Sequence, residues 1–373
     1  MEFEVLRENL VKSLSIANKA ISAKASLPIL QNVLIQSDEG RLKLITSDLE
    51  KSIVTWVGAK IKGEGSVTIP AKLFYNFVSS VRDERLSGII TKNKLNLNTP
   101  TTKAVFNGSP SDSYPQFSYS VTKNFIKINS SVLKRAIEET YFSASNEDTR
   151  PEWTGILLEP TESGLIFVAL DGFRMSKKII PLEISKKSYF EKALIPAKNL
   201  LEVIRLVSKD FDITLDLQPN KGNAVFVLDD VFFVSKLLDG DFPDYNKVVP
   251  SEFICEVTLN YTDFLNAVKT SSVFSKNTGA VRLSIDIKNK KIKFISDDLE
   301  LGKNEQVLKV NSIKGKNTDL AFNLKYLSDY LNNVVSEEVE LKISGVSSPA
   351  LITPKGRKDY TYVVVPVQPY WEE

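Results

Sequence analysis

The sequence predicts an α+β fold made of three repeated domains, each with an antiparallel sheet and two helices on one face. Three observations indicate this. One helical stretch occurs three times at nearly equal intervals, an alternating apolar hairpin precedes each copy, and further strand-like segments follow it. A chain of 373 residues commonly forms two or three domains, so the repeat decides for three, which we place at residues 1–122, 123–251 and 252–373.

The repeated helix is the clearest element. Its copies span residues 69–81, 195–207 and 322–334. Each carries apolar residues at i, i+3, i+4 and i+7, the stripe of an amphipathic helix. Pro70 and Pro196 are expected in the first turn, where a proline loses no hydrogen bond. A basic residue recurs at one helical position in all copies, which independent surface positions have no reason to do: Lys72, Lys198 and Lys325.

Each third is expected to open with a short strand followed by a helix. The predicted helices cover residues 7–21, 131–142 and 262–271. Ser130 or Ser131 is the expected cap of the second one. Lys12 and Arg135 hold corresponding positions on the first two, whereas Asn266 breaks the basic pattern on the third.

A hairpin comes next in every third. The hairpins span residues 33–48, 156–171 and 281–298, and each ends on an aspartate: Asp48, Asp171 and Asp298. Further strands lead to the repeated helix, and more strands follow it. Each third therefore reads β-α-β-β-β-α-β-β-β, and it is antiparallel because hairpin turns leave no room for crossover helices.

Composition narrows the function. The 48 basic and 46 acidic residues give a net charge of +2, so any nucleic-acid surface must be local. Histidine is absent and Cys255 is the only cysteine, which excludes histidine triads, internal disulfides and cysteine-based zinc sites. No glycine-rich phosphate loop occurs. An enzyme is unsupported, no cofactor or metal is expected, and without a signal peptide or long apolar run we expect a cytoplasmic protein.

A sheet whose helices all lie on one side can continue edge to edge into the next repeat. Three repeats then form an arc, and a head-to-tail pair of arcs closes by symmetry with about twelve inner helices. At roughly 9 Å between helix axes and about 10 Å of helix thickness, the lumen is about 24 Å wide. Such a passage admits duplex nucleic acid with a layer of water.

Six short motifs stand in order along the whole chain: Leu27–Leu30 (LPIL), Ser47–Glu50 (SDLE), Ile69–Lys72 (IPAK), Ala169–Met175 (ALDGFRM), Phe242–Tyr245 (FPDY) and Tyr362–Val367 (YVVVPV). Together they resemble the bacterial DNA polymerase III beta subunit, the sliding clamp family. The resemblance implies a DNA clamp fold with the helices on the inner face of a ring, formed by a head-to-tail homodimer. It also implies the partners, which are duplex DNA without sequence preference, the polymerase III catalytic subunit, the clamp loader and other proteins with a clamp-binding motif.

A ring that slides must not grip, so it needs modest positive potential from inward cations that contact phosphates through water. Helix position gives six candidates, and the DNA-touching loops of the family add two more. The expected DNA-binding residues are Lys12, Lys24, Lys72, Arg135, Lys198, Arg205, Lys247 and Lys325.

The resemblance further implies a peptide pocket on the outer face between the second and third domains. Aromatic and aliphatic walls suit an apolar linear motif. The expected wall consists of Trp153, Leu170, Gly172, Phe173, Arg174, Met175, Pro243, Val248, Tyr326, Ser348, Val363, Val365, Pro366 and Val367. An alternative interpretation of residues 363–367 is simply a buried last strand.

Two parts of the chain, the predicted subunit junction and the C-terminal residues, depart from the family pattern. At the subunit junction the expected contacts are Lys103, Ala104 and Phe106 on one side and Val273, Phe274, Glu300 and Glu305 on the other. Gly302, Lys303 and Asn304 thin the acidic side. The chain also adds residues 369–373, and we expect Tyr370 and Trp371 near the pocket rim, where they compete with partners.

Two other function classes stay open. One is a non-ring, three-domain antiparallel scaffold that binds peptides or glycans. The other is a hydrolase using carboxylates, but the spacing of the acidic residues supplies no acid and base pair for one cleft.

Overall fold

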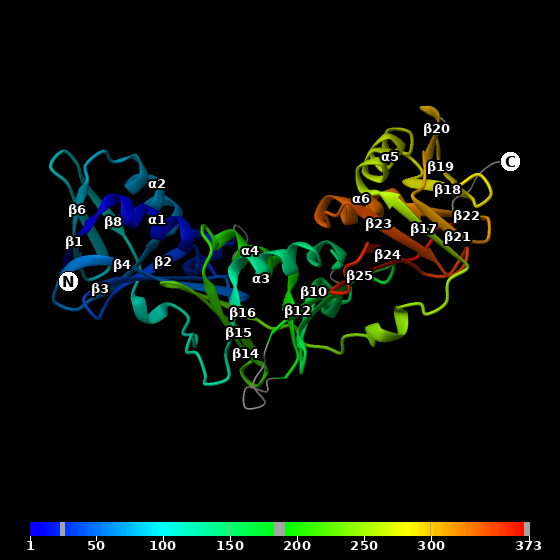
Figure 1. Cartoon of the computed structure of the whole chain (residues 1–373). Helices are drawn as coiled ribbons and strands as arrows, with labels where there is room; N and C mark the ends of the chain where they lie inside the picture. Colours follow the sequence, from blue (N-terminus) through cyan, green and yellow to red (C-terminus); the bar gives the residue numbers. More distant parts are fainter. Residues whose placement is uncertain (23–26, 148, 183–190, 299, 369–373) are drawn as a thin grey trace. The chain divides into compact units, whose positions relative to one another are not determined.

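The computed structural model describes residues 1–22, 27–147, 149–182, 191–298 and 300–368 (Figure 1). The first third forms β1 (Glu2–Leu6), α1 (Arg7–Ala17), β2 (Asn32–Asp38), β3 (Arg41–Ser47), β4 (Lys51–Lys62), β5 (Ser66–Pro70), α2 (Ala71–Ser80), β6 (Arg85–Thr91), β7 (Lys94–Asn98) and β8 (Lys103–Asn107).

The middle third repeats this order of elements, and the last third repeats it with one more strand, β21. The middle third forms β9 (Ile126–Asn129), α3 (Ser130–Glu138), β10 (Gly155–Thr161), β11 (Gly164–Leu170), β12 (Arg174–Pro181), β13 (Ala193–Pro196), α4 (Ala197–Leu206), β14 (Asp212–Gln218), β15 (Asn223–Leu228) and β16 (Val231–Lys236). The last third forms β17 (Cys255–Asn260), α5 (Tyr261–Val273), β18 (Ala280–Asp286), β19 (Lys291–Asp298), β20 (Gly302–Lys309), β21 (Ser312–Gly315), β22 (Thr318–Asn323), α6 (Leu324–Asn333), β23 (Glu338–Ile343), β24 (Ala350–Pro354) and β25 (Tyr360–Val364).

The predicted repeat is confirmed, but the predicted string was one strand short in each of the first two thirds and two strands short in the last. The additional strands β5, β13 and β22 stand directly before the second helix, and the last third also contains β21. Pro70 and Pro196 end two of these strands, with ψ of 113° and 124°, so neither proline lies in the first helical turn. The helices begin one residue later, at Ala71 and Ala197.

Side chains from the preceding strands cap three helices. Asn129 caps α3, since its Oδ1 accepts a hydrogen bond from the backbone N–H of Ser131 at 3.0 Å. The prediction of Ser130 or Ser131 as the cap was therefore wrong. Asn260 and Asn323 cap α5 and α6 in the same way. An asparagine oxygen here satisfies one of the helix's unpaired first N–H groups.

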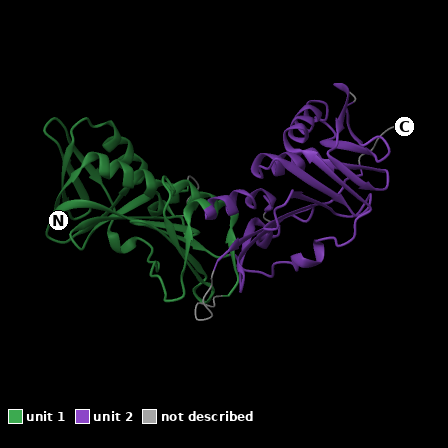
Figure 2. Ribbon diagram, in the orientation of Figure 1, with its two compact units in different colours: residues 1–131, 185–237 green, residues 132–184, 238–373 purple. Residues whose placement is uncertain are grey.

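Unit 1 comprises residues 1–131 and 185–237 (Figure 2). Its sheet runs in the order β8-β7-β6-β1-β4-β16-β15-β14-β9, with β2, β3 and β5 attached through β3–β4. Helices α1 and α2 pack against each other, and α1 packs on β4. The stripe residues Phe74 and Val78 are fully buried in this core beside Leu10 and Leu14.

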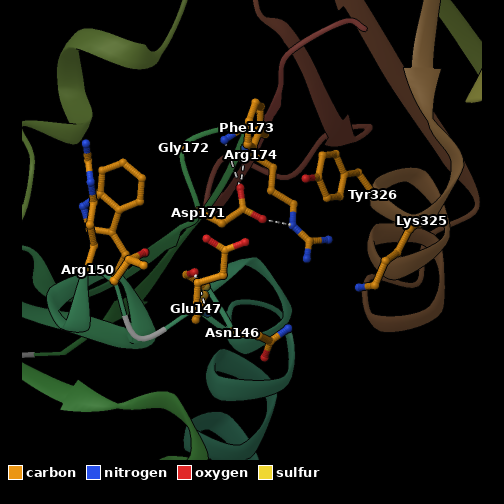
Figure 3. Close-up of a pocket in the computed structure, with 13 residues that line it drawn as sticks. Asn146, Glu147, Arg150, Asp171, Gly172, Phe173, Arg174, Lys325 and Tyr326 are labelled. Atoms are coloured by element: carbon orange, nitrogen blue, oxygen red, sulfur yellow. Dashed lines mark hydrogen bonds and ion pairs between the residues drawn. The ribbon is translucent and has the colours of Figure 1, made fainter. Parts of the chain in front are cut away.

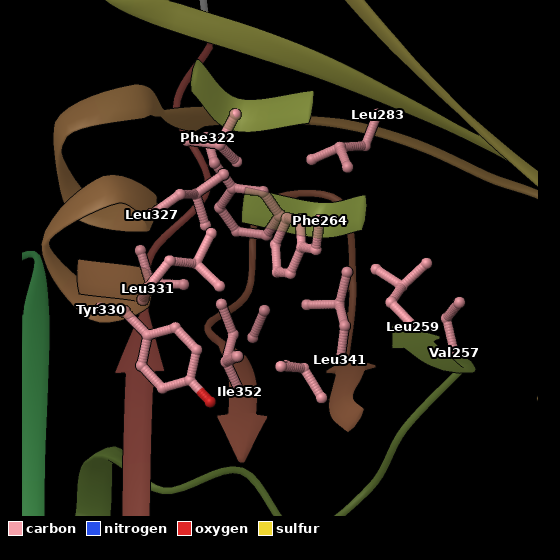
Figure 4. Close-up of a cluster of buried hydrophobic side chains, with 14 of the residues drawn as sticks. Val257, Leu259, Phe264, Leu283, Phe322, Leu327, Tyr330, Leu331, Leu341 and Ile352 are labelled. Atoms are coloured by element: carbon pink, nitrogen blue, oxygen red, sulfur yellow. The ribbon is translucent and has the colours of Figure 1, made fainter. Parts of the chain in front are cut away.

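Unit 2 comprises residues 132–184 and 238–373. One sheet contains the run β10-β11-β12-β25-β24-β23-β17-β21, and a second has the order β20-β19-β18-β22. Helices α5 and α6 pack against each other over a core that includes Phe264, Phe322, Leu327 and Leu331 (Figure 4).

A buried ion cluster also lies in unit 2. The carboxylate of Glu139, only 3% exposed as a side chain, accepts hydrogen bonds from both Nη atoms of Arg357 at 2.8 Å and from Nε of Arg135 at 3.0 Å. Lys178 Nζ lies 2.9 Å from the same carboxylate and also bonds Asp359.

The expectation that sheets continue from one third into the next is confirmed at two places. β4 pairs with β16 within unit 1, with Lys51 opposite Ser235. β12 pairs with β25 within unit 2, with Arg174 opposite Val364. The middle third is thus divided between the two compact units. We call these two strand pairs the first and the second junction.

Candidate functional sites

One turn recurs before each junction strand. Oδ1 of Asp48 accepts hydrogen bonds from the backbone N–H groups of residues 50 and 51 at 3.0 and 2.8 Å. Asp171 binds residues 173 and 174 in the same way, at 3.0 Å each. Asp298 binds residues 300 and 301 at 3.1 and 3.2 Å. The three aspartates of the predicted hairpins therefore accept hydrogen bonds in the same way. The third turn is one residue longer, because Asp298 pairs with Gly302, whereas Asp48 and Asp171 bond Lys51 and Arg174.

The junctions also share their backbone bonding. The N–H of Lys236 donates to the carbonyl of Glu50 at 2.8 Å, and the N–H of Val365 donates to the carbonyl of Phe173 at 2.8 Å. At each junction, a carbonyl in the turn thus accepts a hydrogen bond from the strand that is added to the sheet. The third turn, at Asp298, precedes β20, which is a terminal strand of its sheet among the described elements.

A pocket of about 550 Å³ lies in unit 2 beside the second turn (Figure 3). Five predicted pocket residues line it: Trp153, Gly172, Phe173, Arg174 and Tyr326. Lys325, predicted as a DNA-binding residue, lines it as well. Phe173 is 58% exposed, an unusually accessible aromatic ring at this rim.

The buried side chain of Arg174 holds two walls of the pocket together. Its side chain is 3% exposed; Nε bonds Oδ2 of Asp171 at 2.9 Å, and Nη1 bonds Oδ2 of Asp329 at 2.6 Å. The guanidinium lies 4.4 Å from the ring centroid of Tyr326. Two carboxylates and an aromatic face thus satisfy the buried charge, and they tie the turn to α6.

Gly172 brings an aromatic ring close to the turn. Its φ of +90° lies in the region that favours glycine, and a Cβ there would be 2.8 Å from the ring of Trp153. On that ring rests Arg150, whose guanidinium carbon is 4.3 Å from the centroid. The residue type at position 172 therefore sets the position of this wall.

The structure does not bring the remaining predicted pocket residues into this cavity. Leu170, Met175, Val363 and Pro366 are buried. Within residues 363–367 the buried positions are 363, 364 and 366, so burial there does not strictly alternate. Val365 and Val367 are half-buried at the end of β25, Ser348 is exposed between β23 and β24, and Pro243 and Val248 lie in the segment around the short helix η7 (Tyr245–Val248).

Sequence reasoning missed one wall of the cavity. The missed residues are Ala144, Ser145, Asn146, Glu147, Thr149 and Arg150. They lie in an irregular segment after α3 and have no periodicity, so pattern reading had no signal for them. The Arg-Pro-Glu-Trp sequence at residues 150–153 marks only a turn.

The predicted DNA-binding cations that the structure describes are exposed, but they differ in their partners. Arg135, Arg205, Lys247 and Lys325 each form an ion pair, with Glu139, Glu202, Asp244 and Asp329 at 3.0, 2.6, 3.3 and 2.8 Å. Lys12, Lys72 and Lys198 make no ion pair within 4.0 Å in the part of the chain that the structure describes. Lys24 lies outside the described residues.

The predicted dimer contacts occupy two sheet edges. β8, with Lys103, Ala104 and Phe106, is a terminal strand of the unit 1 sheet. Phe106 points inward, 5% exposed, with its ring edge-to-face against Phe74 and Phe77. At the other edge Glu305 on β20 pairs with Lys293 at 2.7 Å, Glu300 lies just before β20, and Val273 and Phe274 lie at the end of α5.

The described residues contain no group of three or more aspartate, glutamate, cysteine or histidine side chains placed to hold a metal ion. No helix among them is long and apolar enough to cross a membrane. Tyr370 and Trp371, predicted near the pocket rim, lie outside the described range.

Known protein families match the chain from end to end. The N-terminal, central and C-terminal domains of the DNA polymerase III beta subunit match residues 1–118, 127–244 and 246–368. The beta sliding clamp of Staphylococcus epidermidis is 27% identical over 99% of the chain and 100% of its own length. That of Synechococcus elongatus is 27% identical over 98% of both.

Solved structures agree with these matches. The DNA polymerase III beta subunit of Pseudomonas aeruginosa superposes with a TM-score of 0.93 at 26% identity, covering 99% of this chain and 100% of that one. The DNA polymerase sliding clamp of Bacillus subtilis gives a TM-score of 0.94 at 24% identity with the same coverage, which supports the fold.

Proposed function

The chain belongs to the bacterial DNA polymerase III beta subunit family, the DNA sliding clamps, and on this premise we propose that two copies close head to tail into a ring around duplex DNA. The ring holds the replicative polymerase on its template by enclosure and catalyses no reaction. Membership of this family does not favour the non-ring scaffold. The domains at residues 1–122, 123–251 and 252–373 are part of the proposal.

One observation carries ring closure: the two internal junctions share a turn and a backbone bond, and a third turn stands at a free edge. β8 is the last strand of the first third, as β16 is of the middle third. Their residues can be matched because the N–H of Gly108 donates to the carbonyl of Asn93 just as the N–H of Leu237 donates to the carbonyl of Gly222. Gly302, the partner of Asp298 in the third hairpin, takes the place of Lys51, the partner of Asp48 in the first. Transferring the register of the first junction to β20 and β8 of a second copy therefore sets Gly302 opposite Phe106. Ala104 then faces Asn304.

This register has a direct test. Ala104 and Asn304 form a non-hydrogen-bonded pair in the proposed ladder, where Cα atoms lie roughly 4.5 Å apart, close enough for a disulfide. A chain with both Ala104→Cys and Asn304→Cys should give covalent dimers under mild oxidation. Background from Cys255 should be low because this residue is 1% exposed.

The control shifts the register by one residue. Val105→Cys with Asn304→Cys places the two side chains on opposite faces of the ladder, so it should crosslink poorly. Equal crosslinking of both pairs, or none in either, would reject the proposed register. The dimer contacts Lys103, Phe106, Val273, Phe274, Glu300 and Glu305 belong to the same interface.

DNA contact in this proposal is electrostatic and independent of sequence. The helix cations Lys12, Lys72, Arg135, Lys198, Arg205 and Lys325, with Lys24 and Lys247, would face the phosphates through water. Encirclement is tested by loading the protein onto nicked circular plasmid with a clamp loader and then linearising the DNA. Release on linearisation supports a ring, whereas equal retention indicates ordinary affinity.

The unit 2 pocket is the proposed docking site for linear motifs of the polymerase, the clamp loader and other partners. Trp153, Phe173 and Tyr326 offer apolar surface there, and Arg174 holds the turn in place. The buried neighbours Leu170 and Met175, together with Pro243, Val248, Ser348, Val363, Val365, Pro366 and Val367, extend the proposed wall. No cofactor takes part, and the protein would act in the cytoplasm.

A further inference from the structure

The first junction carries a groove that corresponds in position to the pocket at the second. A cavity of about 170 Å³ lies in unit 1 against the turn at Asp48, bordered by Leu49, Glu50 and Lys236. Leu49 stands where Gly172 stands in the second turn, and Lys236 stands where Val365 stands on the neighbouring strand. The same supersecondary unit thus forms both grooves.

A further correspondence comes from the segments that lead to the next third. Tyr114 and Tyr245 are both buried, 2% and 6% exposed. Phe117 follows the first tyrosine at the spacing at which Val248 follows the second. Phe117 borders the first-junction groove, just as Val248 belongs to the proposed wall at the second.

Leu49 is an outlier that folding alone does not explain. Its φ of +75° is unfavourable for a branched, bulky side chain, yet the side chain is 46% exposed and gains little burial. Gly172 meets the same backbone requirement without strain. Backbone strain of this kind concentrates at binding sites.

The first groove differs from the second in charge. Lys236 replaces Val365, and its side chain is 56% exposed, with Nζ 3.9 Å from a carboxylate oxygen of Glu50 that is itself exposed. This distance makes a weak pair, which an entering carboxylate can exchange. Deeper in the groove, Ser47 and Ser52 bond each other at 2.8 Å and need no ligand.

We propose that the first-junction groove is a second peptide site, which takes an acidic linear segment with an apolar side chain on Leu49, Phe117 and Val234 and a carboxylate on Lys236. The proposal rests on the proposed function only in identifying the occupant as a segment of a clamp-binding partner. The apolar contact supplies affinity, and the cation selects the acidic sequence.

Photo-crosslinking locates both grooves in one experiment. The probe is an end-capped hexapeptide with two photoreactive leucines, a phenylalanine and two aspartates, and the adducts are mapped by mass spectrometry on the full chain. In the wild-type protein we expect adducts around Leu49 and Phe117 as well as around Phe173 and Tyr326. A probe with lysines in place of the aspartates should label the first groove about fivefold less.

Two variants separate a site from chance labelling. Leu49→Gly relieves the strained φ, so the protein should fold, and it should lose at least about fivefold of the first-groove adducts. Lys236→Glu should reduce these adducts by about fivefold. Leu73→Ala, at an exposed leucine on α2, is the control and should change nothing.

The outcomes separate this proposal from the one before. Adducts at Phe173 and Tyr326 without adducts at the first junction overturn the second site and leave the clamp function standing. First-groove adducts that persist in Leu49→Gly and Lys236→Glu also overturn it. Adducts at neither groove count against peptide docking altogether, while ring closure is tested separately by the disulfide.

Discussion

Removing the charge of Glu139, the buried residue directly after α3, should destabilise unit 2 strongly. The Glu139→Gln variant keeps the side-chain shape but leaves Arg357 and Lys178 facing a neutral amide. Both cations are largely buried, with side chains 19% and 6% exposed. An amide N–H₂ group also adds donors where the cations already donate.

The magnitude follows from what remains after the substitution. Removing one partner of a buried ion pair typically costs about 3–5 kcal/mol, because the other charge stays buried. Asp359 still binds both Lys178 and Arg357, so the lower end applies and we expect about 3 kcal/mol. For a unit of this size, that lowers Tm by roughly 6–12 °C.

Calorimetry of the wild-type and variant chains measures this loss. Glu138→Gln, at the preceding residue, is the matched control, since Glu138 is 43% exposed and lies 3.8 Å from Lys134. It should change stability by less than about 0.5 kcal/mol. If Glu139→Gln unfolds within about 1 °C of Glu138→Gln, the reasoning about the buried cluster is wrong.

The effect should also depend on pH. Burial opposes ionisation of Glu139, but hydrogen bonds from Arg357 and Lys178 outweigh it and hold its pKa below the usual 4.5. A carboxyl with a lowered pKa in the folded state stabilises the protein above its unfolded pKa, and this contribution is lost as the pH falls through the folded value. The difference between wild type and Glu139→Gln should therefore shrink below about pH 4.5.

Three further predictions concern other sites. Glu202→Gln frees Arg205, which Glu202 binds at 2.6 Å, so sequence-independent DNA binding measured by fluorescence anisotropy should strengthen about twofold to fivefold. Lys198→Gln should weaken the same binding. Weaker binding by the first variant or stronger binding by the second would contradict the proposed inner face. Gly172→Ala should lower the free energy of unfolding by about 1–2 kcal/mol and weaken peptide binding, because its Cβ would meet Trp153 at 2.8 Å. Gly356→Ala is the control: Gly356 also has a positive φ but no neighbour within 4 Å of an added Cβ, so this variant should leave peptide binding unchanged. Burial raises the pKa of the Cys255 thiol, so a disulfide reagent at pH 8 should react at least about 100-fold faster in urea than in buffer; rapid labelling of the native chain would refute its burial.

The repeated helix was predictable from sequence because its apolar stripe faces a core in every copy. Leu200, Val203 and Ile204 are all buried, as their spacing indicates. The short strands before these helices were not predictable in the same way. In β5, Ile69 and Pro70 read equally well as a helix start, and only pairing with β2 decides for a strand.

Helix ends were also misjudged where local geometry changes. The predicted helix at residues 7–21 ends at Ala17, since Asn18–Ala20 tighten into a 3₁₀ turn. The apolar pattern continues through both forms, so periodicity cannot separate them.

The candidate site divides along similar lines. The turn at Asp171 could be predicted because the aspartate recurs in each third, and the structure places five of the predicted wall residues around one cavity. Ion pairing could not be predicted: Lys325 and Lys198 hold the same helical position, yet Asp329 neutralises only the first. Glu202 also stands four residues after Lys198, but it pairs with Arg205 at 2.6 Å. The difference therefore depends on which cation the acidic residue binds, which the sequence pattern does not show.

The two sheet junctions constrain how this chain emerges from a ribosome. The edge of β4 at Lys51 stays unpaired until Ser235 has been synthesised, and the edge of β12 at Arg174 stays unpaired until Val364 has been synthesised. At roughly 5–20 residues per second, each edge stays bare for on the order of ten seconds or more during synthesis. During this time the nascent protein has incomplete sheets with unpaired strand edges. Chaperones or neighbouring chains on a polysome can bind these edges before the native strand is made.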